Sequence, residues 1–155
     1  MHSPTLPAPD AVARLLRDLL GKGVTAKKCG ILSPSAKLYV ATYADDADKI
    51  VSVGVCDLPF AASAGAALSL VPPGVAAEAV RAGLLPAELS ENLREVLNVM
   101  ASLFGATHVR LRDVVSASVA QTVITSGAGA RATARLDVEL AVAVYTGGKL
   151  SFLIV

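Results

Sequence analysis

The sequence predicts an α+β fold in which helices pack on a mainly antiparallel sheet. Apolar residues recur at helical spacing in residues 12–20 and again in residues 91–104, whereas they occupy every second position of residues 136–144. Turns of the hairpin type join the strand-like segments. Helices come early and strands come late, and the hairpin connections favour antiparallel pairing.

The composition fits one folded domain. The chain has 155 residues, of which 54% are hydrophobic, so it is long enough to bury a core and too apolar to stay unfolded. We expect a single domain over residues 1–155, with residues 1–9 as a flexible, proline-rich lead. The formal net charge is only +1 and the basic residues are scattered, which argues against nucleic-acid binding.

Cysteine usage and the N-terminal sequence predict a soluble cytoplasmic protein. Cys29 and Cys56 are the only cysteines, and two isolated cysteines without a signal sequence are typical of reduced thiols. Residues 58–77 carry no charge and are long enough to span a bilayer, but prolines and glycines interrupt them. We therefore expect no membrane span.

The first helix is predicted by the apolar spacing of residues 12–20. We take Asp10 as its N-cap residue, because a short acidic side chain can accept a hydrogen bond from the first turn. Gly21 and Gly23 end the helix, since glycine readily adopts the left-handed conformation of a helix C-terminus.

The middle of the chain is predicted to hold a β-hairpin followed by three helices. Prolines separate the helices, because the residue before a proline disfavours helical geometry. The predicted segments are strands at 37–43 and 50–56 around an acidic loop at 45–48, short helices at 61–70 and 74–82, and a long helix that follows Pro86 and ends at Gly105.

The last third of the chain is predicted to consist of strands and turns. The pair Gly147-Gly148 is a tight hairpin signal. In order, the segments are strands at 108–118 and 120–125, a loop at 126–129, a strand at 136–144, a turn at 146–149 and a return strand at 150–155.

Few residues offer conventional chemistry. His2 and His108 are the only histidines, so a catalytic triad or a zinc site has too few ligands, and the chain has no phosphate-binding loop or dinucleotide fingerprint. Three aspartates in the loop at 45–48 resemble half of a cation site but lack the later glycine and glutamate of a calcium loop. We interpret this loop as a solvated turn and expect no metal site.

Glu91, Glu95 and Asn98 form the most informative pattern, because they fall on one narrow stripe of the long helix. Glu91 and Glu95 are a like-charged pair four residues apart, and Asn98 is a poor helix former in mid-helix. The stripe is either a plain polar surface or a site. Apolar residues gather on the opposite side: Leu89, Leu93, Val96, Leu97, Met100, Leu103 and Phe104.

As a site, the stripe suits phosphoryl transfer on a partner protein. A carboxamide can hold a water molecule through both its oxygen and its nitrogen without deprotonating it. Because the transition state of phosphoryl transfer is loose, positioning matters more than a strong base. A neighbouring carboxylate can pair with a basic residue of the partner, so the mechanism needs no histidine, cysteine or metal from this chain.

The pattern Glu91-x-x-x-Glu95-x-x-Asn98, on a helix that follows hairpin strands and a short alanine-rich helix, resembles the active helix of the CheC/CheX-type chemotaxis phosphatases. These proteins are related in fold to the middle domain of the flagellar switch protein FliM. The resemblance covers residues 38–155 in element order and residues 91–104 in motif. A single motif copy is more similar to CheX than to the two-site CheC.

The resemblance implies a phosphatase that acts on the phospho-aspartate of a CheY-like receiver domain. Glu95 matches the family glutamate that contacts a receiver lysine, and Asn98 matches the asparagine that orients the hydrolytic water. Glu91 stands where the family usually has Asp or Ser, and Ser102 stands where Gly is common; we assign both to partner binding. The chain needs no cofactor of its own, since any Mg²⁺ belongs to the receiver.

The resemblance also implies a homodimer that joins sheet edges, for which the apolar C-terminal strands are candidates. Two other functions stay open. One is a catalytically silent module of the same fold that binds a response regulator or a flagellar switch component. The other is a small-molecule sensor with a deep apolar pocket, in which the stripe is plain surface.

Overall fold

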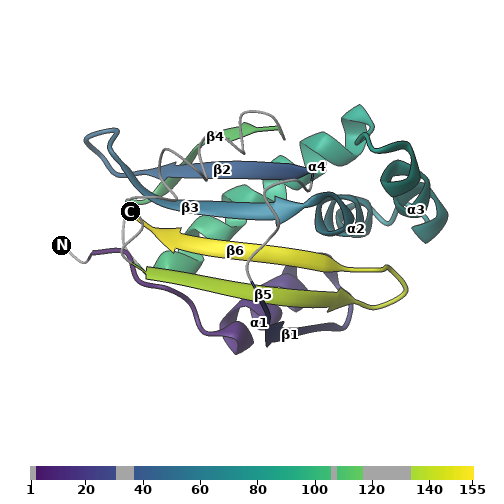
Figure 1. The fold of residues 1–155 in the computed structure, drawn as a ribbon, viewed down its shortest axis with the longest axis horizontal. Coiled ribbons are helices and arrows are strands. Elements are labelled where there is room, and N and C mark those ends of the chain that lie inside the picture. Colours follow the sequence, from purple (N-terminus) through teal and green to yellow (C-terminus); the bar gives the residue numbers. More distant parts are fainter. Residues whose placement is uncertain (1–2, 31–36, 106–107, 117–133) are drawn as a thin grey trace.

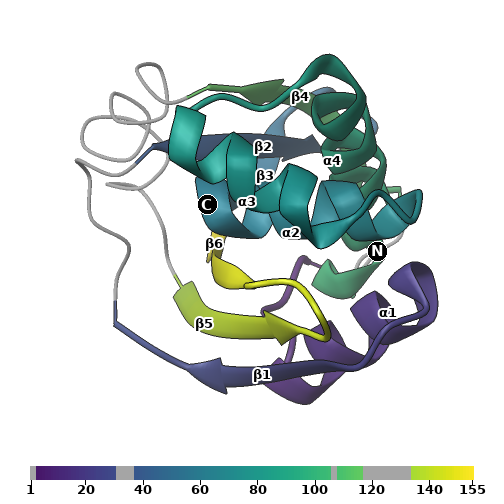
Figure 2. The ribbon, with the colours of Figure 1, turned by 90° about the vertical axis from the view of Figure 1, so that its right-hand side faces the viewer.

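A computed structural model describes residues 3–30, 37–105, 108–116 and 134–155. Its described strands form one antiparallel sheet in the order β1-β5-β6-β3-β2-β4, and the helices cover one face of it (Figures 1 and 2). The strands are β1 Val24–Lys28, β2 Leu38–Ala44, β3 Ile50–Asp57, β4 Arg110–Val115, β5 Ala134–Val142 and β6 Gly148–Ile154; the helices are α1 Pro9–Leu20, α2 Leu58–Leu68, α3 Pro73–Ala82, α4 Ala87–Val99 and the 3₁₀ helix η1 Met100–Phe104.

The predicted α+β class is confirmed, and so are most of its elements. The predicted strands at 37–43 and 50–56 are β2 and β3, and the alternating segment is β5. β4 occupies part of the predicted strand at 108–118, whereas the strand predicted at 120–125 and the loop at 126–129 lie outside the described residues. β1, a short strand that the sequence did not predict, pairs with β5 from Val24↔Val142 to Lys28↔Val138.

The start of α1 corrects one prediction. Ala8, not Asp10, is the N-cap residue, and no side chain caps the helix. Pro9 occupies the first helical position, where its missing N–H costs nothing, and Asp10 lies in the first turn, where its charge favours the helix dipole. Gly21 ends the helix as predicted, with a left-handed φ of 64°. In the N-terminal lead, Thr5 donates its backbone N–H to the Phe104 carbonyl at 2.7 Å.

The predicted long helix changes its winding before it ends. It is α-helical to Val99, continues as the 3₁₀ helix η1, and ends at Gly105 with a φ of 68°. The buried Tyr43 hydroxyl donates to the Leu97 carbonyl at 2.6 Å, just before this change. A strand side chain thus satisfies a carbonyl near the end of the α-helical hydrogen-bond ladder.

The main core lies between the sheet and its helices. Tyr43, Phe104 and Phe152 are buried at its centre, with ring centroids 5.1 Å apart for the first pair and 5.8 Å apart for the second. These edge and tilted contacts are the geometries that aromatic pairs prefer. The rings join β2, η1 and β6, so the end of the long helix is fixed against the middle of the sheet.

The strand order decides which strands are free to join two sheets edge to edge in a dimer. The C-terminal strands β5 and β6, which the sequence offered for a contact between sheet edges, lie inside the sheet. Its described edges are β1 and β4. None of the helices in the described part of the chain is long and apolar enough to cross a lipid bilayer.

The N-terminus of α2 is fixed by Asp57, whose carboxylate accepts N–H hydrogen bonds from Phe60 at 2.9 Å and Lys149 at 3.1 Å. Burial raises the pKa of the Asp57 carboxyl above its ordinary value of 3.8, although these two N–H groups oppose the shift. The group therefore holds its proton more tightly in the folded chain than in the unfolded chain. Ionisation of Asp57 therefore lowers the free energy of unfolding as the pH rises.

We expect Asp57→Asn to reveal this cost, because asparagine caps helices as well as aspartate does and carries no charge. The free energy of unfolding of the wild type, minus that of the variant, should fall as the pH rises from about 3 to about 7. Urea unfolding across this pH range measures the difference. A difference that rises with pH would mean that the N–H hydrogen bonds outweigh burial.

Candidate functional site

Glu91, Glu95 and Asn98 lie on α4 with exposed side chains, as the helical spacing predicts. Ser102 is also exposed but belongs to η1, where its hydroxyl donates to the Val99 carbonyl at 3.1 Å. Within the described residues, the side chains of Glu95 and Asn98 have neither an ion pair nor a hydrogen bond. Their carboxylate and carboxamide are therefore free to bind a partner.

The opposite side of the long helix anchors the stripe to the core. Leu89, Leu93, Val96 and Leu97 are fully buried, and so are Met100 and Phe104 of η1. Leu103, which was assigned to the same side, is half-buried and packs at its margin. Because the buried side chains fix the rotation of α4 about its axis, the stripe is held in one orientation toward solvent.

α4 packs closely on α2 at a glycine. A Cβ atom added to Gly65 would lie only 2.6 Å from the Leu89 carbonyl oxygen, so the two backbones touch there. Asn92 closes the contact by donating from Nδ2 to the Gly65 carbonyl at 2.8 Å and to the Ser69 hydroxyl at 2.7 Å. The sequence did not predict this role of Asn92, because it depends on groups at and just after the end of another helix, α2.

The exposed stripe has a different flank on each side. Toward the sheet edge, Arg94 Nη1 lies 4.0 Å from Asp113 Oδ1 of β4. On the other side, α1 and the end of the long helix form an open, mainly apolar groove of about 510 Å³. Its lining residues are Ala11, Arg14, Leu15, Asp18, Leu19, Val99 and Leu103. Asn98 therefore stands beside apolar surface that a docking protein can cover.

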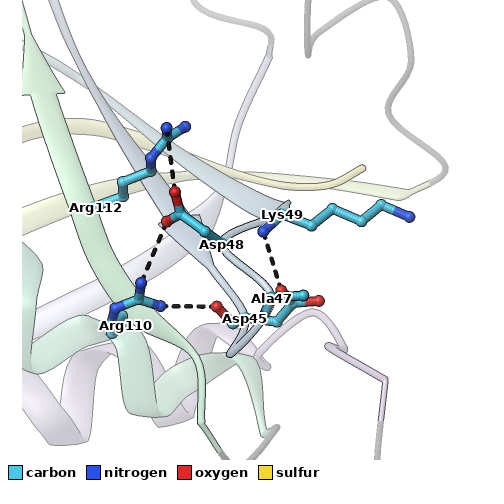
Figure 3. A network of polar contacts seen from close by, with 6 residues as sticks. All are labelled: Asp45, Ala47, Asp48, Lys49, Arg110 and Arg112. Carbon is cyan, nitrogen blue, oxygen red and sulfur yellow. Dashed lines mark hydrogen bonds and ion pairs between the residues drawn. The ribbon is translucent and has the colours of Figure 1, made fainter.

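The acidic hairpin loop between β2 and β3 is a structured turn. Asp45 Oδ1 accepts from the backbone N–H of Ala47 at 2.9 Å and of Lys49 at 3.0 Å (Figure 3). Asp48 pairs with Arg110 at 3.2 Å and with Arg112 at 3.4 Å. These basic residues belong to β4, so the loop carboxylates fasten the hairpin to the edge strand.

The remaining residues with reactive side chains, a histidine and two cysteines, are either paired or at least partly buried. His108 is exposed, and its Nδ1 lies 3.5 Å from Asp46 Oδ2. Cys56 is completely buried, and burial raises the pKa of its thiol, so it is protonated and inaccessible. Cys29 is half-buried, its pKa is also raised by burial, and both cysteines are free thiols. In the part of the chain that the structure describes, no three acidic, histidine or cysteine side chains are grouped to hold a metal ion.

Comparison with known proteins shows the fold. No family model matches the sequence, and no curated protein matches it. FliY of Thermotoga maritima superposes with a TM-score of 0.57 at 12% identity, covering 96% of this chain and 84% of that chain. The FliM middle domain of Vibrio alginolyticus superposes with a TM-score of 0.60 at 8% identity, covering 94% of this chain and 89% of that chain. The chain therefore has the α+β fold of FliY and of the FliM middle domain.

Proposed function

We propose that this chain is a phosphatase that removes the phosphoryl group from the phospho-aspartate of a CheY-like receiver domain. The observation that carries the proposal is the pair Glu95 and Asn98. Their side chains are exposed, lie one helical turn apart, and have no partner within the described residues. A helix fixed by buried residues on its other side presents both groups in a constant geometry.

In the proposed reaction, Glu95 binds a lysine at the active site of the receiver and Asn98 enters that site. The Asn98 carboxamide holds one water molecule in line with the bond between phosphorus and the aspartate oxygen. The water oxygen attacks phosphorus, the bond to the aspartate oxygen breaks and leaves a free carboxylate, and both protons of the water stay on the inorganic phosphate, which is released as H2PO4⁻. The receiver's Mg²⁺ supplies charge neutralisation when it is bound, so this chain contributes positioning.

The groove beside α1 supports docking of the same partner. It adjoins the stripe through Val99 and Leu103, which flank Asn98 and Ser102 in the sequence. A receiver that reaches Asn98 must cover this surface, and the half-buried Leu15 and Leu19 of α1 would add apolar contact. Glu91 lies one turn before Glu95 and extends the acidic surface toward the start of α4. We assign Glu91 and Ser102 to the margin of the contact.

Substitution of Asn98 tests the reaction directly. Purified CheY-like receivers are phosphorylated with a small-molecule donor, the donor is removed, and release of inorganic phosphate is followed with and without the chain. The wild type should accelerate release, and Asn98→Ala should lower the rate constant by about 100-fold, the effect of losing one positioning group. Alanine is a better helix former by about 0.5 kcal/mol, so the variant should be at least as stable as the wild type.

Ser90→Ala is the matched control, since Ser90 is exposed on α4 outside the stripe. Its rate should equal that of the wild type. If no receiver that binds the chain loses phosphate faster than it does alone, the chain is not a phosphatase. Binding without acceleration would instead identify a silent interaction module, a role compatible with its FliM-like fold.

A further inference from the structure

Several large apolar side chains are exposed on segments at one end of the molecule. Within the described residues, the large hydrophobic side chains that are exposed are Leu70, Val75, Val80, Leu84 and Val144. Their segments are the linkers on both sides of α3, α3 itself and the turn between β5 and β6, which lie together at the right-hand end in Figure 1, the end that faces the viewer in Figure 2. Concentrated exposed apolar surface of this kind marks an interaction site.

The outer side of α3 carries a groove. α3 packs on α2 and buries Ala76 and Ala79, and most of its other residues are exposed. The groove has a volume of about 420 Å³, and Leu84 beside it is 70% exposed. Residues that line it include Gly74, Val75, Glu78, Ala82, Leu84 and Pro86. The small residues among them leave room for a second helix to approach closely.

The charges on this side of α3 are arranged to match themselves. Glu78 and Arg81 are exposed and form an ion pair within the helix. A two-fold axis that passes between Ala79 and Val80 would place Glu78 opposite Arg81 of a second, antiparallel copy, and Arg81 opposite its Glu78. The same axis places Val75 opposite Leu84 of the second copy. One register therefore satisfies both the charged and the apolar pairs, as a two-fold interface requires.

We propose that this groove binds a second copy of the chain, so that two α3 helices pack antiparallel about a two-fold axis. Each Leu84 fills the groove beside Val75 of the other copy and supplies apolar contact. The two pairs between Glu78 and Arg81 set the register more than the affinity. Pro86 marks the near end of α4, and Asn98 lies roughly 18 Å further along that helix. The groove therefore lies away from Asn98, and the proposal does not depend on the phosphatase activity.

Sedimentation equilibrium over a wide range of protein concentrations tests the dimer. The wild type should associate to a dimer as its concentration rises. Leu84→Asp should raise the dimer dissociation constant by about 100-fold, because two charges enter the interface. Arg17→Glu, a charge reversal on the exposed side of α1, should leave the constant unchanged. A wild type that stays monomeric at every concentration would overturn the proposal, and so would a dimer that tolerates Leu84→Asp, which would point to the sheet edges.

Charge reversal tests the register. Glu78→Arg alone and Arg81→Glu alone each place like charges opposite one another, so each variant should be mainly monomeric. An equimolar mixture of the two variants restores both pairs and should form a heterodimer with nearly wild-type affinity. Failure of the mixture to associate while the wild type dimerises would rule out the antiparallel α3 register. Circular dichroism of each variant confirms that the fold is retained.

Discussion

Replacing Glu95 with lysine is expected to raise the KM for a phosphorylated receiver by about 10- to 100-fold while kcat changes little. In the proposed complex, Glu95 pairs with a lysine of the receiver, and the variant sets two ammonium groups against each other. An interaction made equally in the bound and transition states affects KM rather than kcat. Asn98→Ala should instead lower kcat and change KM little, since Asn98 orients the attacking water only for the reaction. Initial rates measured over a range of receiver concentrations separate the two effects.

The Glu95→Lys variant is a clean test because it should not weaken the fold. Glu91 and Glu95 form a like-charged pair four residues apart, which costs a few tenths of a kcal/mol. A lysine at position 95 turns that repulsion into attraction, so the free energy of unfolding should stay the same or rise slightly. Glu88→Lys, an exposed charge reversal two turns nearer the helix start than Glu95, should change KM much less. A fall in kcat at unchanged KM for Glu95→Lys would contradict the pairing role.

The elements that the sequence predicted are those with strong internal periodicity. Every second residue of β5 is apolar, and the long helix repeats its apolar residues at helical spacing, so each pattern is readable without knowing its neighbours. β1 has neither signal. It is five residues long, ends in Lys27 and Lys28, and is a strand because β5 lies beside it. Pairing with β5, and not a local sequence signal, therefore makes β1 the edge strand of the sheet.

The candidate site likewise has one part that the sequence predicted and one part that it did not. The exposure of Glu95 and Asn98 followed from the rotation of the helix alone. The groove beside them did not, because it needs α1, whose residues lie about eighty positions earlier. Similarly, the change to 3₁₀ winding after Val99 occurs beside the buried Tyr43 hydroxyl, which belongs to a distant strand. Contacts between remote segments leave no periodic signal in either partner.

The close packing of α2 on α4 makes Gly65 a position where a single added methyl group should lower the stability of the fold. A Cβ there would lie 2.6 Å from the Leu89 carbonyl oxygen and 3.3 Å from the Leu89 Cα, and neither atom can move without shifting α4. We expect Gly65→Ala to lower the free energy of unfolding by about 3 kcal/mol, through overpacking and the strained Asn92 hydrogen bonds. Urea unfolding at a low, fixed protein concentration measures this change.

Gly74→Ala is the matched control, because Gly74 is also helical but nothing lies within 4 Å of a Cβ built there. Alanine is the better helix former, so this variant should be as stable as the wild type or more stable by up to about 1 kcal/mol. The same gain applies to Gly65→Ala in isolation, and only the contact with Leu89 reverses its sign. If both variants were stabilised, the helices would have room to separate. The position of the stripe would then depend on the buried face of α4 and not on its contact with α2.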